Sequence, residues 1–192
     1  MAQETTYPMT YDVEYPQELS RWLIFVKWLL AIPHWIILCA LGMAQGAITL
    51  VAWFAILFTG RYPRFLFDFV VNVYRWNANV GAYVYLLRDE YPPFTWEAGQ
   101  YPVTFEVEYP ERLSRWLIFV KWLLIIPHVI VLYFMMLAWF VTTMIAFFAI
   151  LFTKRYPEGL FRFAVGVQRW SNRINVYVNL LRDEYPPFSL AP

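Results

Sequence analysis

Two long apolar runs dominate the hydropathy pattern of the chain. They cover residues 22–59 and 116–153, and their only formal charges are Lys27 and Lys121. A continuous helix of about 38 residues measures about 57 Å, whereas the hydrocarbon core of a bilayer is about 30 Å thick and needs about 20 residues. We therefore expect each run either to cross a membrane twice as a hairpin or to cross once after an interfacial segment.

A second pattern follows each apolar run. The segment 64–87 places polar residues at steps of four, four, three and four: Arg64, Asp68, Asn72, Arg75 and Asn79. In its counterpart, the same positions hold Glu158, Arg162, Gly166, Arg169 and Arg173. Apolar residues fill much of the rest, which predicts an amphipathic helix. Before each apolar run, an alternating segment such as 10–15, ended by Pro16, predicts a short strand.

An internal repeat organises these elements. Shifting the chain by 94 residues aligns 7–98 with 101–192 without a gap, and 54 of 92 positions are identical. Blocks with charges or prolines recur, whereas 39–51 and 133–145 have diverged. The chain is therefore a tandem duplication, with a first membrane repeat at 1–98 and a second at 99–192.

The charge distribution favours the hairpin. All twelve arginines lie outside the apolar runs, so two crossings per repeat place every arginine on one side, as the positive-inside rule requires. Gly42, Gln45 and Gly46 offer a turn in the first run, but 135–138 in the second run is poor turn chemistry. The alternative is a break at Pro33 and one span over 34–59, which would place the two Arg-Tyr-Pro segments on opposite sides.

The predicted fold is thus an all-α integral membrane protein of two tandem repeats. Each repeat has a hydrophobic helical hairpin followed by an amphipathic interfacial helix, with a short extended segment at its start. Composition agrees, because 60% of residues are hydrophobic and 15% are charged, against about 45–50% and about 25% in soluble domains. The polar opening of the chain lacks a signal-peptide pattern. We expect a bacterial cytoplasmic (inner) membrane location, multi-pass, with both termini cytoplasmic.

Candidate binding residues are basic side chains near the predicted interface. We expect eight of them to contact lipid headgroups: Arg61, Arg64, Arg75, Lys154, Arg155, Arg162, Arg169 and Arg173. A net charge of +1 gives no reason to expect nucleic acid as a partner. The expected partners are membrane lipids and either further copies of the chain or a larger membrane complex.

A polar stripe runs along the first apolar segment. Ser20, Lys27 and His34 recur every seven residues, and Lys121 and His128 are equivalents in the second copy. We interpret Lys27 as snorkelling to the headgroups. His34 follows Pro33, and a polar group there most often satisfies the interrupted helix backbone, although a haem or proton-relay role is an alternative.

No pattern of catalytic residues is present in the sequence. It contains no CxxC, HExxH or glycine-rich phosphate loop. The adjacent acids Asp89 and Glu90 precede Tyr-Pro-Pro and predict a solvated exit from a helix. We therefore predict a protein that is not an enzyme and has no cofactor, metal site or catalytic residue.

Three blocks, YPVTFEVEYPERLSRWLIFVKWLLIIPH, AILFTKRYPEGLFRF and LLRDEYPPF, resemble the bacterial membrane family catalogued as domain of unknown function 4389, here in tandem. The resemblance covers nearly the whole chain and implies a small bacterial integral membrane protein, without implying an activity, a cofactor or a site residue. It supports the location and transfers no mechanism.

The expected function is that of a small non-catalytic membrane scaffold or accessory subunit. Its basis is the one-sided charge distribution combined with the amphipathic helices. The alternative is an oligomeric channel or small transporter whose path is lined by Ser20, Lys27, His34 and their equivalents. A third possibility, an electron or proton carrier, would use His34 and His128.

Overall fold

The computed structural model describes residues 7–192; the first six residues, which begin the predicted polar opening of the chain, lie outside the described part. The first repeat forms β1 (Met9–Val13), α1 (Leu23–Leu30), α2 (Ile32–Thr59) and α3 (Arg64–Val84). The second forms β2 (Val103–Val107), α4 (Leu117–Leu124), α5 (Ile126–Thr153) and α6 (Glu158–Val178). The predicted two-repeat layout and the short strands are therefore present, and a further helix follows each long apolar helix.

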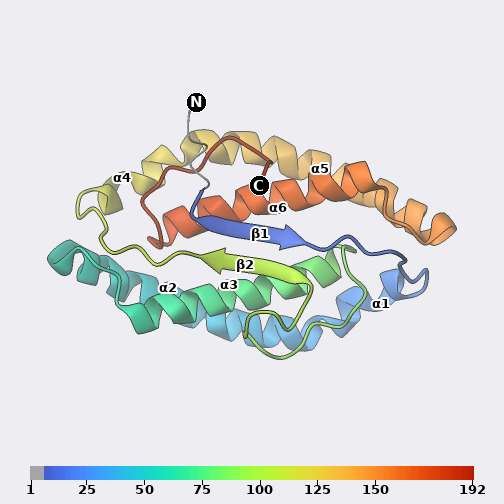
Figure 1. Ribbon diagram of the computed structural model, residues 1–192, viewed down its shortest axis with the longest axis horizontal. Coiled ribbons are helices and arrows are strands. Elements are labelled where there is room, and N and C mark those ends of the chain that lie inside the picture. Colours follow the sequence, from blue (N-terminus) through green and yellow to red (C-terminus); the bar gives the residue numbers. More distant parts are fainter. Residues whose placement is uncertain (1–6) are drawn as a thin grey trace.

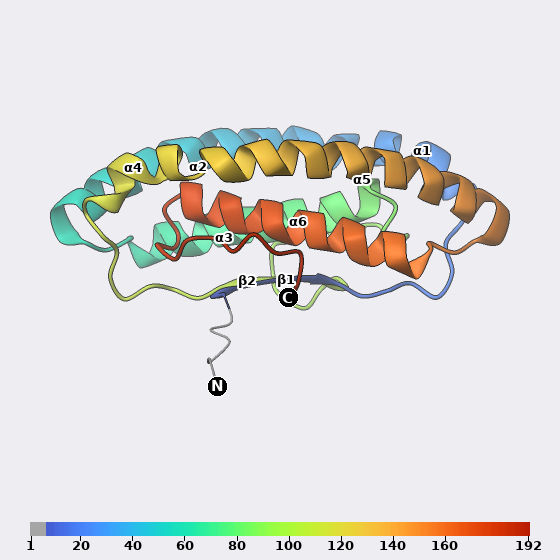
Figure 2. The ribbon, with the colours of Figure 1, turned by 90° about the horizontal axis from the view of Figure 1, so that it is seen from above.

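The elements are stacked in three layers (Figure 2). Helices α1, α2, α4 and α5 form one outer layer, α3 and α6 form the middle layer, and the two strands cover the opposite side. Within the strands, alternate residues such as Tyr11 and Phe105 are buried, while Asp12 and Glu106 are exposed, as expected of a ribbon with one face on a core. Polar and apolar surfaces thus lie on opposite sides of the molecule.

The two strands pair antiparallel and define the symmetry of the fold. Met9 pairs with Val107, and Val13 pairs with Val103, so the register is centred on Tyr11 and Phe105. These two residues are themselves equivalent under the 94-residue shift. A pseudo-two-fold axis therefore passes between them and through the three layers, and Figure 1 is viewed along it.

The repeats are interlocked across this axis. Strand β1 packs against α6 of the second repeat, and β2 packs against α3 of the first. Where the connecting loops meet, the Leu113 backbone N–H donates to the Gly60 carbonyl, and the Leu19 N–H donates to the Lys154 carbonyl, each at 2.8 Å. Each repeat consequently completes its core with a strand from the other.

The predicted hairpin is wrong. Helix α2 runs without interruption from Ile32 to Thr59, through Gly42 and Gly46, and α5 is continuous over the corresponding length. An internal glycine costs a helix about 1 kcal/mol, which is less than the cost of leaving backbone groups unpaired in an apolar setting. The break expected in the alternative arrangement is present, because α1 ends at Leu30 and α2 begins at Ile32 with Pro33 in its first turn.

Helices α3 and α6 occupy the middle layer. Eleven residues of α3 are buried, including Phe67, Val70 and Trp76. It packs against both α2 and β2, and Arg75 of its polar stripe donates to the Phe105 carbonyl oxygen of β2. The amphipathic pattern of 64–87 therefore serves to join the apolar helix layer to the ribbon.

Candidate functional site: buried polar networks and an apolar layer

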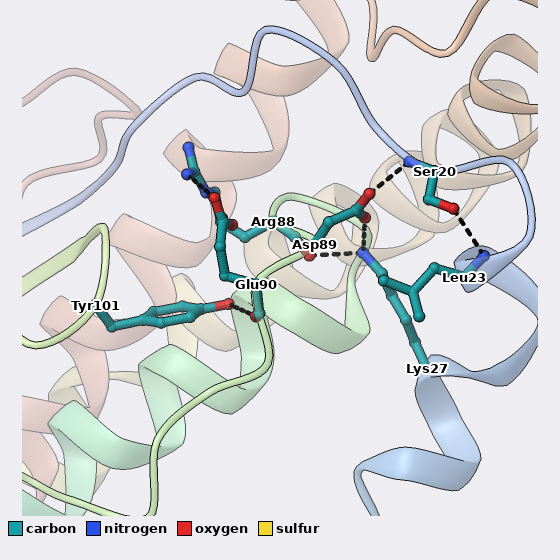
Figure 3. A network of polar contacts seen from close by, with 7 residues as sticks. All are labelled: Ser20, Leu23, Lys27, Arg88, Asp89, Glu90 and Tyr101. Carbon is teal, nitrogen blue, oxygen red and sulfur yellow. Dashed lines mark hydrogen bonds and ion pairs between the residues drawn. The ribbon is translucent and has the colours of Figure 1, made fainter.

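A buried lysine joins α1 to the segment that follows α3 (Figure 3). Lys27 is 1% exposed, and its Nζ lies 2.7 Å from Asp89 Oδ1 and 2.6 Å from the Arg88 carbonyl oxygen. The Tyr83 ring lies beneath the ammonium, with 5.0 Å between Nζ and the ring centroid. The interpretation of Lys27 as a snorkelling residue is wrong, since its charge is neutralised inside the protein.

Asp89 connects this lysine to the start of α1. Its Oδ2 accepts a hydrogen bond from the Ser20 backbone N–H, and Ser20 Oγ accepts one from the Leu23 N–H at 3.4 Å. A carboxylate that pairs with an ammonium and also accepts an amide proton is held by a charge-charge contact and a charge-assisted hydrogen bond. Asp89 therefore binds α1 and the residues just before it. The prediction that Asp89 lies in a solvated exit from a helix is wrong.

Arg88 and Glu90 extend the network toward the ribbon. The Arg88 guanidinium donates to both Glu90 carboxylate oxygens and to the Glu14 carbonyl oxygen, while Tyr101 donates to the Glu90 carbonyl oxygen at 2.7 Å. Burial raises the pKa of the Glu90 carboxyl, but the hydrogen bonds from Arg88 and the backbone outweigh it and hold that pKa below its usual value. Burial raises the pKa of Tyr101, which stays protonated and donates.

The second repeat reproduces the network. Lys121 Nζ lies 2.9 Å from Asp183 Oδ1 and 2.6 Å from the Arg182 carbonyl oxygen, and the Ser114 N–H donates to Asp183 at 2.5 Å. Tyr7 of the first repeat donates to the Glu184 carbonyl oxygen at 3.2 Å. The two tyrosines thus bind the opposite repeat, and each network helps to lock the halves together.

The histidines are enclosed in aromatic boxes. Trp76 Nε1–H donates to His34 Nδ1 at 3.1 Å, and Phe94 stacks on the imidazole with centroids 4.0 Å apart. His128 has the same relation to Trp170 and Phe188. Both imidazoles are 0% exposed. Because Nδ1 accepts a hydrogen bond, a neutral ring carries its proton on Nε2. Each box fixes α2 or α5 to the middle layer.

Three of the predicted headgroup ligands instead bind backbone carbonyl oxygens of the protein. Arg75 donates to the carbonyl oxygens of Phe105 and Trp96. Arg169, 6% exposed, binds the Tyr11 carbonyl and Asp12. Arg173 is 2% exposed and donates to carbonyl oxygens in the C-terminal segment. The reason is that the ribbon and tails present unpaired carbonyls to this stripe, and a guanidinium satisfies several at once.

The other five predicted contacts are exposed and lie where α2 joins α3 or α5 joins α6. They are Arg61, Arg64, Lys154, Arg155 and Arg162. Arg64 pairs with Asp68 at 3.0 Å, and Arg162 pairs with Glu158 at 3.3 Å, so the order of charges is reversed between the copies. These side chains remain available to a ligand outside the molecule.

The outer layer of helices presents most of the large exposed hydrophobic side chains. On α2, they form one stripe along the whole helix: Trp35, Ile36, Ile37, Met43, Leu50, Val51, Phe54 and Phe58. On α5, the stripe is Val129, Ile130, Val131, Tyr133, Phe134, Leu137, Phe140, Val141, Met144, Ile145, Phe148 and Phe152. Trp22 and Trp116 are about four-fifths exposed at the starts of α1 and α4. A monomeric soluble protein rarely exposes so extended an apolar surface.

These features define a small, two-fold repeated helical protein with an apolar layer. Two helical runs, Leu23–Thr59 and Leu117–Thr153, are long and apolar enough to cross a membrane by length and composition. The family model described as "Domain of unknown function (DUF4389)" matches residues 21–95 and 115–189. The chain belongs to this family, in a tandem copy. Comparisons with curated proteins and with solved structures give no significant match.

Proposed function

We propose that this protein is a non-catalytic scaffold or accessory subunit of the bacterial cytoplasmic membrane. Its apolar helix layer binds membrane lipid, and its ribbon layer faces the cytoplasm, where a partner protein or further copies of the chain would bind. The observation that carries the proposal is the segregation of large exposed hydrophobics onto α1, α2, α4 and α5, opposite a ribbon that exposes Asp12 and Glu106.

The size of the apolar layer supports lipid binding. Full burial of one large apolar side chain contributes about 1.5–3 kcal/mol, and the two long stripes alone hold some twenty of them. Even if each gained a small part of that value, the sum would exceed the free energy of reversible surface binding. We therefore propose that the protein stays bound to the membrane permanently.

The polar networks favour a scaffold over a channel. A path along Ser20, Lys27 and His34 needs these groups to face an aqueous lumen. Instead, Lys27 Nζ is held by Asp89 and the Arg88 carbonyl, and the imidazole of His34 is stacked on Phe94. These contacts fix helices in place and leave no free charge along the stripe.

Flotation with phosphatidylcholine vesicles tests the proposal. The wild-type protein should float with the vesicles. The twin change Met43→Lys with Leu137→Lys should reduce the floating fraction, since both side chains are exposed on the apolar stripe and a charge in hydrocarbon costs about 3 kcal/mol.

The matched control is Thr10→Lys with Thr104→Lys, which adds the same charges to the exposed side of the ribbon and should float like the wild type. Vesicles recovered from the flotation should also differ in shape or diameter from protein-free ones. A folded wild-type protein that stays in the aqueous fraction, or that floats without altering the bilayer or self-associating, contradicts the proposal.

A further inference from the structure

We infer that the protein lies flat in a single leaflet, with its long helices parallel to the membrane plane, and that neither apolar run crosses the bilayer. This inference rests on the proposed membrane location and concerns orientation. Its ligand is one face of a lipid bilayer, in contact with α1, α2, α4 and α5.

The symmetry of the fold gives the first argument. The pseudo-two-fold axis runs through the layers, between Tyr11 and Phe105. The C-terminal ends of α2 and α5 therefore lie at opposite ends of the long axis (Figure 1). If the long axis stood along the membrane normal, the equivalent Arg61 and Arg155 would lie on opposite sides of the bilayer. If the layers lie parallel to the membrane, both copies of each motif meet the same environment.

Charge on the ribbon gives the second argument. Asp12 and Glu106 are exposed, and the strands that hold them, β1 and β2, lie near the middle of the long axis, on the side opposite the apolar layer (Figure 2). An upright molecule would place them at the depth of the bilayer centre, where an ionised side chain costs about 3 kcal/mol or more. It would also expose the edges of a two-stranded ribbon to hydrocarbon, where unpaired backbone groups are not tolerated. A flat molecule keeps the whole ribbon in water.

Helix length agrees with this orientation. Helices α2 and α5 each have 28 residues, or about 42 Å of helix at 1.5 Å per residue, against a hydrocarbon core of about 30 Å. The exposed stripe continues from Trp35 to Phe58 on α2, while the opposite side of the helix buries His34, Ala52 and Ile56. A helix lying in the interface needs one apolar face and has no length limit.

A comparison of the two repeats indicates that lipid, and not a partner protein, covers the apolar layer. Most buried positions of the long helices are identical in the two copies: His34 with His128, Ala52 with Ala146 and Ile56 with Ile150, while buried Trp139 corresponds to Gln45. Several outward positions change size while staying apolar: Trp35 becomes Val129, Cys39 becomes Tyr133, and Gly46 becomes Phe140, although others, such as Phe54 and Phe148, are identical. A partner protein packs against a surface as densely as a protein interior and would require side chains of matching shape. Fluid acyl chains adapt to side chains of either size.

Basic residues border the apolar layer at both ends. Arg115 lies beside Gly60, because a Cβ built on that glycine would be 3.5 Å from Arg115 Nε. Arg115 and Arg61, the residue after Gly60, therefore lie together at one end of the layer. At the other end, Arg21 donates to the Phe152 carbonyl at 3.0 Å, next to Lys154 and Arg155. In the flat orientation, both clusters reach the phosphates of the same leaflet.

Two measurements on the reconstituted full chain test the orientation. The single cysteine, Cys39, is exposed on α2 and is first replaced by serine. Arg61→Cys and Arg155→Cys are then made separately, and the protein is added to preformed phosphatidylcholine–phosphatidylglycerol vesicles. A membrane-impermeant maleimide should modify both positions fully before the vesicles are lysed. Protection of one position until lysis would overturn the inference.

The second measurement reports depth. Fluorophores at Ile36→Cys, Met43→Cys and Leu50→Cys, all exposed on the stripe, should each be quenched more by nitroxides near the headgroups than by nitroxides near the acyl-chain ends. A fluorophore at Thr104→Cys on the ribbon should respond to an aqueous quencher instead.

The outcomes separate the two proposals. Strongest quenching of Met43→Cys by the deep nitroxide means a crossing, which refutes the flat orientation and leaves the membrane scaffold standing. A protein that forms a water-soluble dimer, with all three positions shielded in the absence of vesicles, means that a second copy covers the layer and refutes both.

Discussion

Replacing Asp89 by asparagine should destabilise the protein strongly while leaving its shape nearly unchanged. The carboxylate is the charge partner of Lys27, with 2.7 Å between Nζ and Oδ1, and the lysine side chain is 2% exposed against 22% for the aspartate. An asparagine oxygen can still accept from the Ser20 N–H. The change therefore removes the charge and keeps the hydrogen bond that begins α1.

The magnitude follows from the asymmetry in exposure. Breaking a buried ion pair by removing one partner costs about 3–5 kcal/mol, because the remaining charge is uncompensated. Because Asp89 has some access to water, we expect about 3 kcal/mol for Asp89→Asn. Lys27→Met should cost less, about 1–2 kcal/mol, because the aspartate left behind is solvated and keeps its amide donor.

The assay is equilibrium unfolding in detergent micelles, followed by tryptophan fluorescence and circular dichroism. The double variant Lys27→Met with Asp89→Asn should be more stable than Asp89→Asn alone, since it no longer buries an unpaired ammonium. The twin variant Asp183→Asn should repeat the loss through Lys121, which lies 2.9 Å from Asp183. If Asp89→Asn unfolds at the wild-type denaturant concentration, or if the double variant is the least stable, the reasoning is refuted.

Two further predictions concern the tail and acid stability. A Cβ at Gly166 would lie 2.9 Å from Leu190 Cβ and 3.0 Å from the Leu190 carbonyl oxygen. Gly166→Ala should therefore displace residues 189–192 and speed their proteolysis. Gly159→Ala, whose added Cβ meets open space, should leave the proteolysis rate unchanged. The pKa of Glu90 is lowered in the folded protein from its ordinary value of 4.5, so its contribution to stability is present above that value and is lost as pH falls through the folded pKa. Glu90→Gln should therefore flatten the decline in unfolding free energy as the pH falls below 4.5, measured by denaturant titration at a series of pH values. An unchanged slope would contradict the role of the Arg88 contact.

Local elements could be predicted well from the sequence. Period-two alternation over 10–15 marks β1, which is Met9–Val13, and the polar steps from Arg64 mark α3, which begins at that residue. These signals are local, because each depends on which face of a single element is apolar. The tandem repeat was also visible, because identity at one fixed offset requires no structure.

Tertiary partners could not be predicted in the same way. Arg169 finds the Tyr11 carbonyl 158 residues away, and its place on a polar helix stripe is equally typical of a headgroup ligand. The hydropathy pattern also does not indicate that β1 packs against α6 and β2 against α3, each in the other repeat. A signal for the lysine network did exist, since Lys27 with Asp89 and Lys121 with Asp183 recur at one spacing, but spacing alone does not tell pairing from coincidence.

The path of the apolar runs could not be predicted from hydropathy. The hydropathy pattern allows two crossings or one, and both arrangements assume that a long apolar helix must traverse the bilayer. The one-sided distribution of arginines favours an arrangement in which both repeats share an environment. A flat orientation gives this arrangement without the turn at Gly42 and Gly46, which lie inside a continuous helix.

The orientation of the helices in aligned bilayers tests the central claim most directly. Helices α2, α3, α5 and α6 all run along the layers (Figure 2), so polarised infrared dichroism of the amide I band reports a nearly uniform direction. The account predicts helix axes close to the membrane plane, with the dichroism of an in-plane helix. Axes within about 40° of the bilayer normal, the range of transmembrane helices, would contradict it.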